Sequence, residues 1–285
     1  MTRSLAVYVL CCASVTVVSA ADAPLFPDPD LEAAVRAQVY GKRDNKEPLT
    51  VDDVKSLSGI SAKGKPIKDL SGLERCAALA QLEISNAEVT DLSALRGLTN
   101  IQLLTLNNNR IQDVSPLAGM NHLQYLDLGN NQVSDLKPIA QLTGLNTLYL
   151  SGNHVVDLFP LKGLTRLSSL HLDGNQITDL RPIGGLKPLS SLDLENNKIT
   201  DLSALAGLNS LQYLFLEGNP VSDLTPLITM ARKDAEGEKR FAPFCMVYLS
   251  PHQGKAEQVA ELKKYLHTVE VSAAKPEGHK GGKKK

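Results

Sequence analysis

The chain has 285 residues, in which 30 Lys and Arg nearly balance 31 Asp and Glu. Without a surplus of basic residues to neutralise phosphates, this composition argues against specific nucleic-acid binding. Aromatic residues make up only 4% of the chain and Trp is absent, so the core has to be built from aliphatic side chains.

The first twenty residues have the pattern of a targeting segment. Arg3 supplies a positive start, residues 5–18 are largely apolar, and Val18-Ser19-Ala20 resembles a small-x-small cleavage site. Such a segment is too short to span a bilayer and is typical of a secretory signal peptide. We therefore expect cleavage near Ala20 and a secreted or periplasmic protein with no membrane span. The alternatives are a buried N-terminal strand or an uncleaved anchor.

Residues 21–56 are expected to form an N-terminal lead and helical cap. Asp28 followed by Pro29 is typical of the N-cap and first turn of a helix. A second short helix is expected to begin at Thr50, with Asp53 in the position of a capping box.

A repeat of 22 residues fills residues 57–230, with the consensus L-x-x-L-x-L-x-x-N-x-I-x-D-L-x-P-L-x-G-L-x-x. Six clear copies begin at Ile101, and two weaker copies precede them from Leu57, which gives eight. The L-x-L piece alternates in and out, as a short strand does. The pattern predicts an α/β leucine-rich-repeat solenoid: a curved parallel β-sheet on the concave face, short turns or 3-10 segments on the convex face, and helical caps.

Two polar residues recur at fixed places in the repeat. An Asn follows the strand in the last six copies, where a buried amide can satisfy backbone groups and form a ladder; Lys65 and Ala87 replace it in the first two copies. An Asp recurs in every copy. A row of calcium-binding or acid–base carboxylates is one interpretation, but capping of the following turn explains both the spacing and the repetition. These residues are Asp69, Asp91, Asp113, Asp135, Asp157, Asp179, Asp201 and Asp223.

Residues 231–271 are expected to form a C-terminal strand–helix cap. Within it we predict a charged loop at 231–240, a strand at 245–249 and a helix at 255–267. Residues 272–285 are rich in Lys and Gly and are expected to be a disordered tail, either solubilising or in contact with an anionic polymer.

The cysteines outside the targeting segment, Cys76 and Cys245, lie near opposite ends of the predicted solenoid. A disulfide would need their Cα atoms within about 7 Å, so we interpret both as small buried apolar residues. The chain contains no Walker motif, dinucleotide fingerprint or zinc-ligand spacing. We therefore expect no cofactor and no bound metal.

The repeat resembles that of the internalin-type bacterial leucine-rich-repeat proteins, and FPDPDLEAAV followed by LTVDDVKSLSGI resembles the helical cap before internalin repeats. The resemblance covers roughly residues 26–230. It implies a curved solenoid that binds proteins or carbohydrate on its concave strands. The period is also similar to that of the leucine-rich-repeat regulatory subunit of protein phosphatase-1. That protein works inside cells, and the expected signal peptide argues against it.

The third, fifth and seventh residues of each repeat are expected to face the concave side. There the later copies carry aromatic rings flanked by carboxylates, a combination typical of protein or sugar recognition. The alternative is that the tyrosines only fit pleated strands. We expect a monomer that binds a basic protein; carbohydrate or cell-envelope polymer binding and a purely structural role are the alternatives. The candidate partner-binding residues are Tyr125, Asp127, Tyr149, His171, Asp173, Asp193, Glu195, Tyr213, Phe215 and Glu217.

A catalytic or metal site on the same face is a further hypothesis. His171 and Asp193 would lie on neighbouring strands and could form a general base or a metal site. Ser169 and Ser191, however, lie on an open face without a pocket or oxyanion donors, and Asp173 or Glu195 would be a poorly placed third ligand. The sequence therefore favours a binding module and not an enzyme.

Overall fold

A computed structural model describes residues 24–272 apart from residues 238 and 242. The signal peptide expected at 1–20 and the tail expected at 272–285, except for Ser272, lie outside the described residues. Among the described helices, none is both long enough and apolar enough to cross a bilayer.

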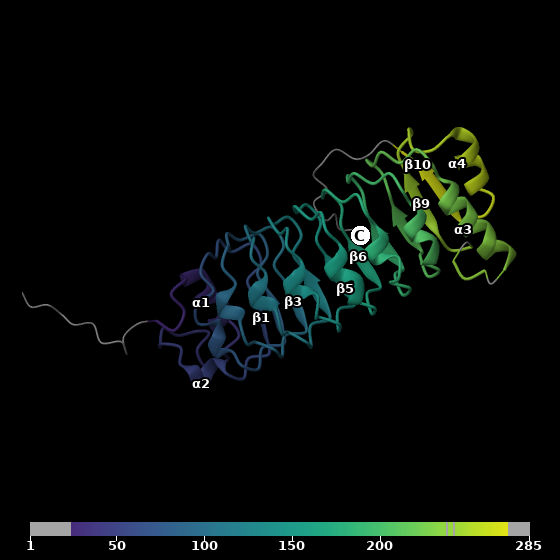
Figure 1. Cartoon of the computed structure of the whole chain (residues 1–285). Helices are drawn as coiled ribbons and strands as arrows, with labels where there is room; N and C mark the ends of the chain where they lie inside the picture. The colour runs from purple at the N-terminus through teal and green to yellow at the C-terminus, as the bar shows by residue number, and fades with distance from the viewer. Residues whose placement is uncertain (1–23, 238, 242, 273–285) are drawn as a thin grey trace, which may run out of the picture.

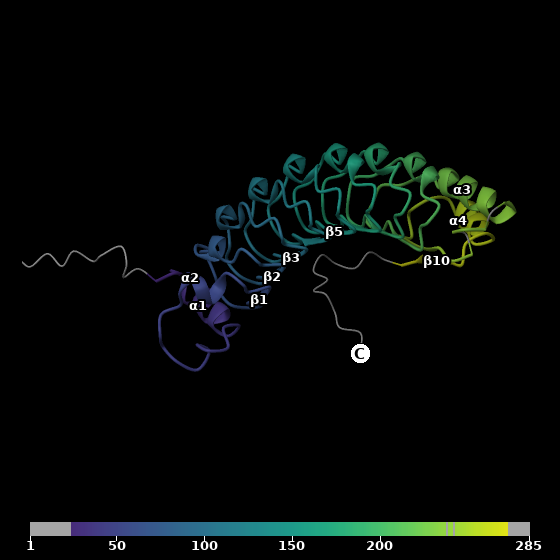
Figure 2. The same ribbon diagram turned by 90° about the horizontal axis from the view of Figure 1, so that it is seen from below.

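The described part of the chain forms one sheet of ten parallel strands that pair in chain order. Figure 1 shows the strands stacked along the long axis of the molecule, and Figure 2 shows the sheet curving with the strands on its inner side. The strands are β1 (Gly59–Ser61), β2 (Gln81–Glu83), β3 (Leu103–Thr105), β4 (Tyr125–Asp127), β5 (Thr147–Tyr149), β6 (Ser169–His171), β7 (Ser191–Asp193), β8 (Tyr213–Phe215), β9 (Met246–Leu249) and β10 (Thr268–Val271).

The register of the sheet follows directly from the repeat. Leu104 pairs with Leu126 and Leu126 with Leu148, so each residue of a strand lies beside its counterpart one repeat later. The central Leu of each strand is buried, as are the other consensus aliphatic positions. Because each coil buries its leucines against the next coil, the core is one continuous column, and each buried Leu contributes on the order of 1.5–3 kcal/mol.

Short 3-10 helices return the chain along the convex side (Figure 2). The recurrent Asp precedes each return segment, and in all eight repeats it accepts the backbone N–H two residues later at 2.8–2.9 Å. The capping interpretation of these carboxylates is confirmed. The 3-10 helices are η1 (Leu73–Arg75), η2 (Ser93–Leu95), η3 (Ser115–Leu117), η4 (Lys137–Ile139), η5 (Phe159–Gly163), η6 (Arg181–Ile183) and η7 (Ser203–Gly207).

The recurrent Asn forms the predicted ladder. Asn153 donates its side-chain N–H groups to the carbonyls of Leu128 and Leu150, at 2.9 and 3.0 Å. Its carbonyl oxygen accepts the backbone N–H of Val133 in the preceding repeat at 2.9 Å. The Leu128 carbonyl also accepts a hydrogen bond from Asn131. Each Asn therefore links two consecutive coils, and neighbouring rungs share acceptors.

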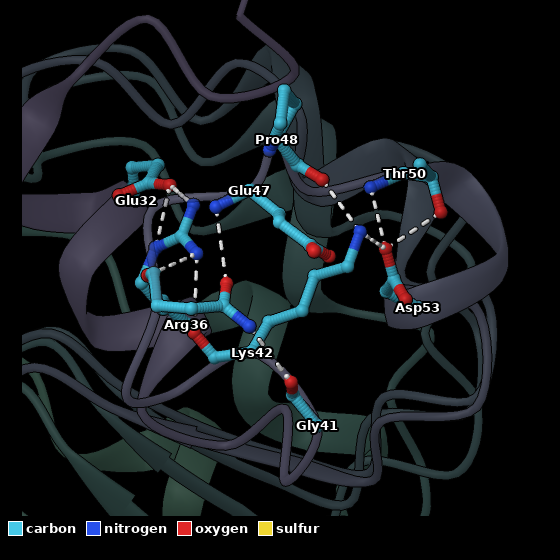
Figure 3. A network of polar contacts seen from close by, with 9 residues as sticks. Glu32, Arg36, Gly41, Lys42, Glu47, Pro48, Thr50 and Asp53 are labelled. Atoms are coloured by element: carbon cyan, nitrogen blue, oxygen red, sulfur yellow. Dashed lines mark hydrogen bonds and ion pairs between the residues drawn. The ribbon is translucent and has the colours of Figure 1, made fainter.

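The N-terminal end of the column is covered by α1 (Pro29–Arg36) and α2 (Val51–Val54), and Thr50 and Asp53 form the predicted capping box. Asp28 caps α1, and its second carboxylate oxygen accepts N–H groups of Lys68 and Asp69 in the first repeat. The segment between the two helices is held by the polar network shown in Figure 3. In it, Arg36 binds Glu32 and two backbone carbonyls, while Lys42 binds Asp53 and the Pro48 carbonyl.

The C-terminal end differs from the sequence prediction in two places. Residues 231–236, expected within a charged loop, belong to α3 (Thr225–Glu236), which begins at the Pro of the last repeat and buries Leu227, Met230 and Ala231. Thr229 and Met230 stand there in place of the consensus Gly and Leu, and the helix continues past them. The expected C-terminal helix is α4 (Ala256–Leu262), and the chain after it returns to the sheet as β10, which was not predicted.

Both cysteines of the described chain are free and buried, as interpreted from the sequence. Burial raises the pKa of Cys76 to about 11 and that of Cys245 to about 12, so both thiols stay protonated.

Replacing a rung of the Asn ladder is expected to destabilise the column locally. In Asn153→Ala the Val133 N–H stays buried without its acceptor, and the three carbonyls of Leu128, Leu150 and Ser151 each lose a donor. We expect the free energy of unfolding to fall by about 2–3 kcal/mol, measured by urea denaturation. His154→Ala, at the exposed neighbouring position, is the matched control and is expected to change it by less than about 0.5 kcal/mol. Equal effects of the two substitutions would show that the ladder contributes nothing.

Candidate functional site

The fifth residues of five consecutive repeats lie in one row across β4 to β8. The register pairs Asp127 with Tyr149, Tyr149 with His171, His171 with Asp193, and Asp193 with Phe215. The predicted alignment of Tyr149, His171 and Asp193 on adjacent strands is therefore confirmed. Their side chains are only partly buried, on the inner side of the curved sheet.

The centre of this row is an aromatic stack. The Tyr149 and His171 rings are nearly parallel, with centroids 4.3 Å apart and planes 11° from each other. Tyr125, two residues before Asp127 on β4, tilts against Tyr149 with centroids 5.7 Å apart. Burial, reinforced by Asp127, raises the pKa of Tyr125 to about 12, so its phenol remains a hydrogen-bond donor. These contacts hold the rings in place before any partner arrives.

Phe215 is not freely exposed on the concave face. It stacks on Tyr248 of β9, with centroids 4.6 Å apart and planes 12° from each other, and is half-buried. Tyr248 was missed because the 22-residue period is interrupted by α3 and the segment after it. The alternation in Met246–Leu249 could have placed it in this row. Tyr213, two residues before Phe215, is exposed at 39%.

His171 lies between a hydroxyl and a carboxylate. The Ser169 Oγ is 2.9 Å from His171 Nε2, and Asp193 Oδ2 is 3.8 Å from Nδ1. This is the order of a catalytic triad, but the carboxylate is beyond hydrogen-bond range of the ring. The backbone N–H of Ser169 donates to a carbonyl of the neighbouring strand, so it is not available as an oxyanion donor. The geometry therefore supports a recognition role for His171 better than a catalytic one.

Two carboxylates of the face are held in an unfavourable electrostatic environment. Burial raises the pKa of Asp127 above its ordinary value. Burial, followed by the charge of Asp193, raises that of Asp173. Among the described residues, no Lys or Arg lies within ion-pair distance of either carboxylate. The fold thus keeps partly desolvated negative charges on this face without a cation of its own.

The seventh position is only partly available to a partner. Asp173 accepts a hydrogen bond from Ser151, and Glu195 is half-buried. Glu217 is 6% exposed, so the expectation that it presents its carboxylate to a partner is wrong. The C-terminal cap reaches the backbone next to it, where Gln253 donates to the carbonyls of Leu216 and Asn219.

Within the described residues, no group of three His, Cys, Asp or Glu is placed to hold a metal ion.

The raised pKa values give a prediction about stability. A carboxyl whose pKa is higher in the folded chain loses free energy of unfolding as the pH rises through and above the ordinary pKa of the unfolded group. We therefore expect Asp127→Asn to raise the free energy of unfolding at pH 7 by about 0.5–1 kcal/mol, and the Tm with it. The substitution removes the desolvated charge, while the amide still accepts the Gly129 N–H. The gain should persist above the folded-state pKa of Asp127 and be lost as the pH falls through that pKa towards the ordinary pKa of the carboxyl.

The matched control is Asp113→Asn on the convex side. Hydrogen bonds from the backbone and side chain of Ser115 hold the pKa of Asp113 below its ordinary value, so this substitution is expected to lower the Tm at pH 7. Calorimetry of both variants from pH 4 to 7 checks the opposite signs. A lower Tm for Asp127→Asn would contradict a desolvated carboxylate at that site.

Comparisons with known proteins agree with this architecture. Family models described as "Leucine rich repeat" and "Leucine Rich repeats (2 copies)" match residues 165–221 and 99–141. Comparison with curated protein sequences gives no match.

The solved structures with a similar architecture include the following three bacterial proteins. The crystal structure of internalin C2 from Listeria monocytogenes is 36% identical, covers 72% of this chain and 91% of its own, and superposes with a TM-score of 0.69. Internalin F from the same organism is 30% identical over 87% of this chain and 71% of its own, with a TM-score of 0.76. A Leptospira interrogans leucine-rich-repeat protein is 28% identical over 72% and 53% of the two chains, with a TM-score of 0.60.

The likeness to internalin C2 spans almost the whole of that protein and rests on the same repeat and sheet. The chain therefore belongs to the internalin-type family of bacterial leucine-rich-repeat proteins.

Proposed function

We propose that this protein is an exported recognition module that binds a basic protein on its concave β-sheet. A leucine-rich-repeat solenoid of the internalin type implies protein recognition in general. The observation that carries the finer proposal is the row across β4 to β7, where Asp127 and Asp193 flank the stacked rings of Tyr149 and His171. A partly desolvated carboxylate that forms no ion pair with any Lys or Arg of the described residues gains most from a positively charged partner.

This function needs no catalytic group, metal or cofactor. We propose that the protein acts as a monomer, with the signal peptide removed near Ala20 and the mature chain secreted or periplasmic.

Loss of the concave aromatic rings is expected to abolish partner capture. The wild-type protein and a Tyr149→Ala, His171→Ala, Phe215→Ala variant are immobilised and exposed to the envelope fraction of the source cell, and retained proteins are identified by mass spectrometry. We expect a basic protein that binds the wild type and is reduced at least about tenfold on the variant, since buried aromatic anchors dominate such interfaces.

A variant of the convex face is the matched control. Val156→Ala, Phe159→Ala, Lys162→Ala removes comparable exposed side chains from the other side of the coil. It should retain the partner at wild-type level. Equal retention by both triple variants would contradict concave-face recognition, and capture of a glycan in a parallel array would favour the carbohydrate alternative.

Export is tested separately. The chain is expressed with a C-terminal tag, the periplasmic and culture fractions are collected, and the N-terminus of the exported protein is sequenced. We expect a mature start next to Ala20. A full-length protein confined to the cytosol would contradict the proposed export.

A further inference from the structure

We propose that the concave face reads an extended segment with the pattern cation–x–apolar–x–cation, which runs across the strands from β4 to β7. This inference rests on the proposed function and specifies the chemistry of the partner. Asp127 would bind the first cation, the Tyr149–His171 stack the apolar side chain, and Asp193 the second cation.

The two carboxylates are presented in the same way. Asp127 Oδ1 accepts the backbone N–H of Gly129 at 2.9 Å, and Asp193 Oδ1 accepts that of Glu195 at 3.1 Å. Each Asp is the last residue of its strand and uses one oxygen to fix its side chain on the backbone N–H two residues later. The second oxygen remains for another partner, and at Asp193 it lies 3.8 Å from His171 Nδ1. Two carboxylates that are held in the same way can bind a ligand that carries two cationic donors.

The surroundings of Asp127 leave room for a cationic side chain. The seventh residue of that repeat is Gly129, which places no side chain of its own beside the carboxylate, whereas a Cβ there would lie 3.2 Å from Asp127 Oδ1. On the other flank lie the rings of Tyr125 and Tyr149, tilted at 45° to each other. An ammonium or guanidinium group beside Asp127 would therefore have a carboxylate and an aromatic face within reach.

The spacing of the row matches an extended chain. Asp127 and Asp193 are three strands apart, which is about 14 Å at a strand separation near 4.8 Å, and the aromatic stack lies midway at about 7 Å. In an extended segment, residues i, i+2 and i+4 project from one side at about 0, 7 and 13 Å. The inward curve of the sheet brings the side-chain tips slightly closer together, which improves the match (Figure 2).

A helical ligand does not fit this spacing. A helix rises about 1.5 Å per residue, so about 14 Å corresponds to nine residues, which places the two cations on opposite faces. Only an extended segment brings both cations and the apolar side chain to the sheet together.

The test uses the full chain and short labelled peptides. The first peptide carries two arginines at i and i+4 with leucine at i+2 and serine between them. A second has the same composition with the arginines at i and i+3, and a third replaces the leucine by serine. Fluorescence anisotropy at low salt measures Kd for each. We expect the first peptide to bind at least about tenfold more tightly than the other two.

Double-mutant cycles test which arginine of the peptide binds Asp127 and which binds Asp193. Asp127→Asn and Asp193→Asn are each combined with a peptide that lacks one of its two arginines. If the proposal holds, each protein substitution costs affinity for the full peptide but little further affinity once its partner arginine is gone. Asp113→Asn on the convex side is the control and should leave Kd unchanged.

The outcomes separate the specific inference from the general function. Equal Kd values for the i+3 and i+4 peptides, or no effect of Asp127→Asn and Asp193→Asn, would overturn the reading of an extended motif, while partner capture that depends on the concave rings would still support protein recognition. A further variant changes the five lysines of residues 275–285 to Gln. If the peptides bind only to that variant, the occupant of the row is the chain's own C-terminal segment, and the proposal of an external ligand is overturned.

Discussion

Every element of this molecule depends on one constraint: a coil of 22 residues has too little interior to bury its own leucines. Each coil therefore has to bury its leucines against the next coil. The register of the strands, the curvature of the sheet and the common direction of the strands follow from that requirement. The Asn ladder solves the polar side of the same problem. It joins the backbone groups of consecutive coils in the region where the chain turns and where a lone coil would leave them unsatisfied.

The end caps cover the first and the last coil, each of which lacks a neighbouring coil on one side. At the N-terminus, Asp28 ends the column with a carboxylate that binds backbone N–H groups of both the cap helix and the first coil. At the C-terminus, the column ends with β9 and β10, whose residues do not follow the repeat but still extend its sheet. To join the sheet, a strand needs only main-chain hydrogen bonds to its neighbour and a buried side chain at every second residue. These requirements are weaker than those of the full 22-residue consensus.

Most of the fold was predictable because it repeats. Eight copies of one pattern average out local ambiguity, so the strands, the Asp caps and the lateral order of Tyr149, His171 and Asp193 all follow from spacing alone. Prediction failed where the period stopped. The continuation of α3 through residues 231–236 and the return of β10 have no second copy to compare with. Glu217 is buried next to the backbone carbonyls that Gln253 of the C-terminal cap binds, and no local pattern indicates a contact between positions at least 34 apart.

Within the site, the sequence indicates which residues lie on the face but not how they interact. The stacking of Tyr149 on His171 and of Phe215 on Tyr248 depends on rotamers that each ring adopts against its neighbours. The raised pKa of Asp127 likewise depends on how much water reaches it between those rings. These are properties of side-chain arrangement, which a consensus of single letters does not encode.

Neighbouring strands are paired with a constant offset of one repeat, so equivalent side chains on the concave sheet are evenly spaced. Gain or loss of one whole repeat between β4 and β7 would leave every coil as well packed as before. It would nevertheless move Asp193 by one strand separation, about 4.8 Å, relative to Asp127. Unequal crossing-over within such a gene would therefore change the distance between these side chains without weakening how the protein folds. In this architecture, the number of repeats sets the spacing of the concave face.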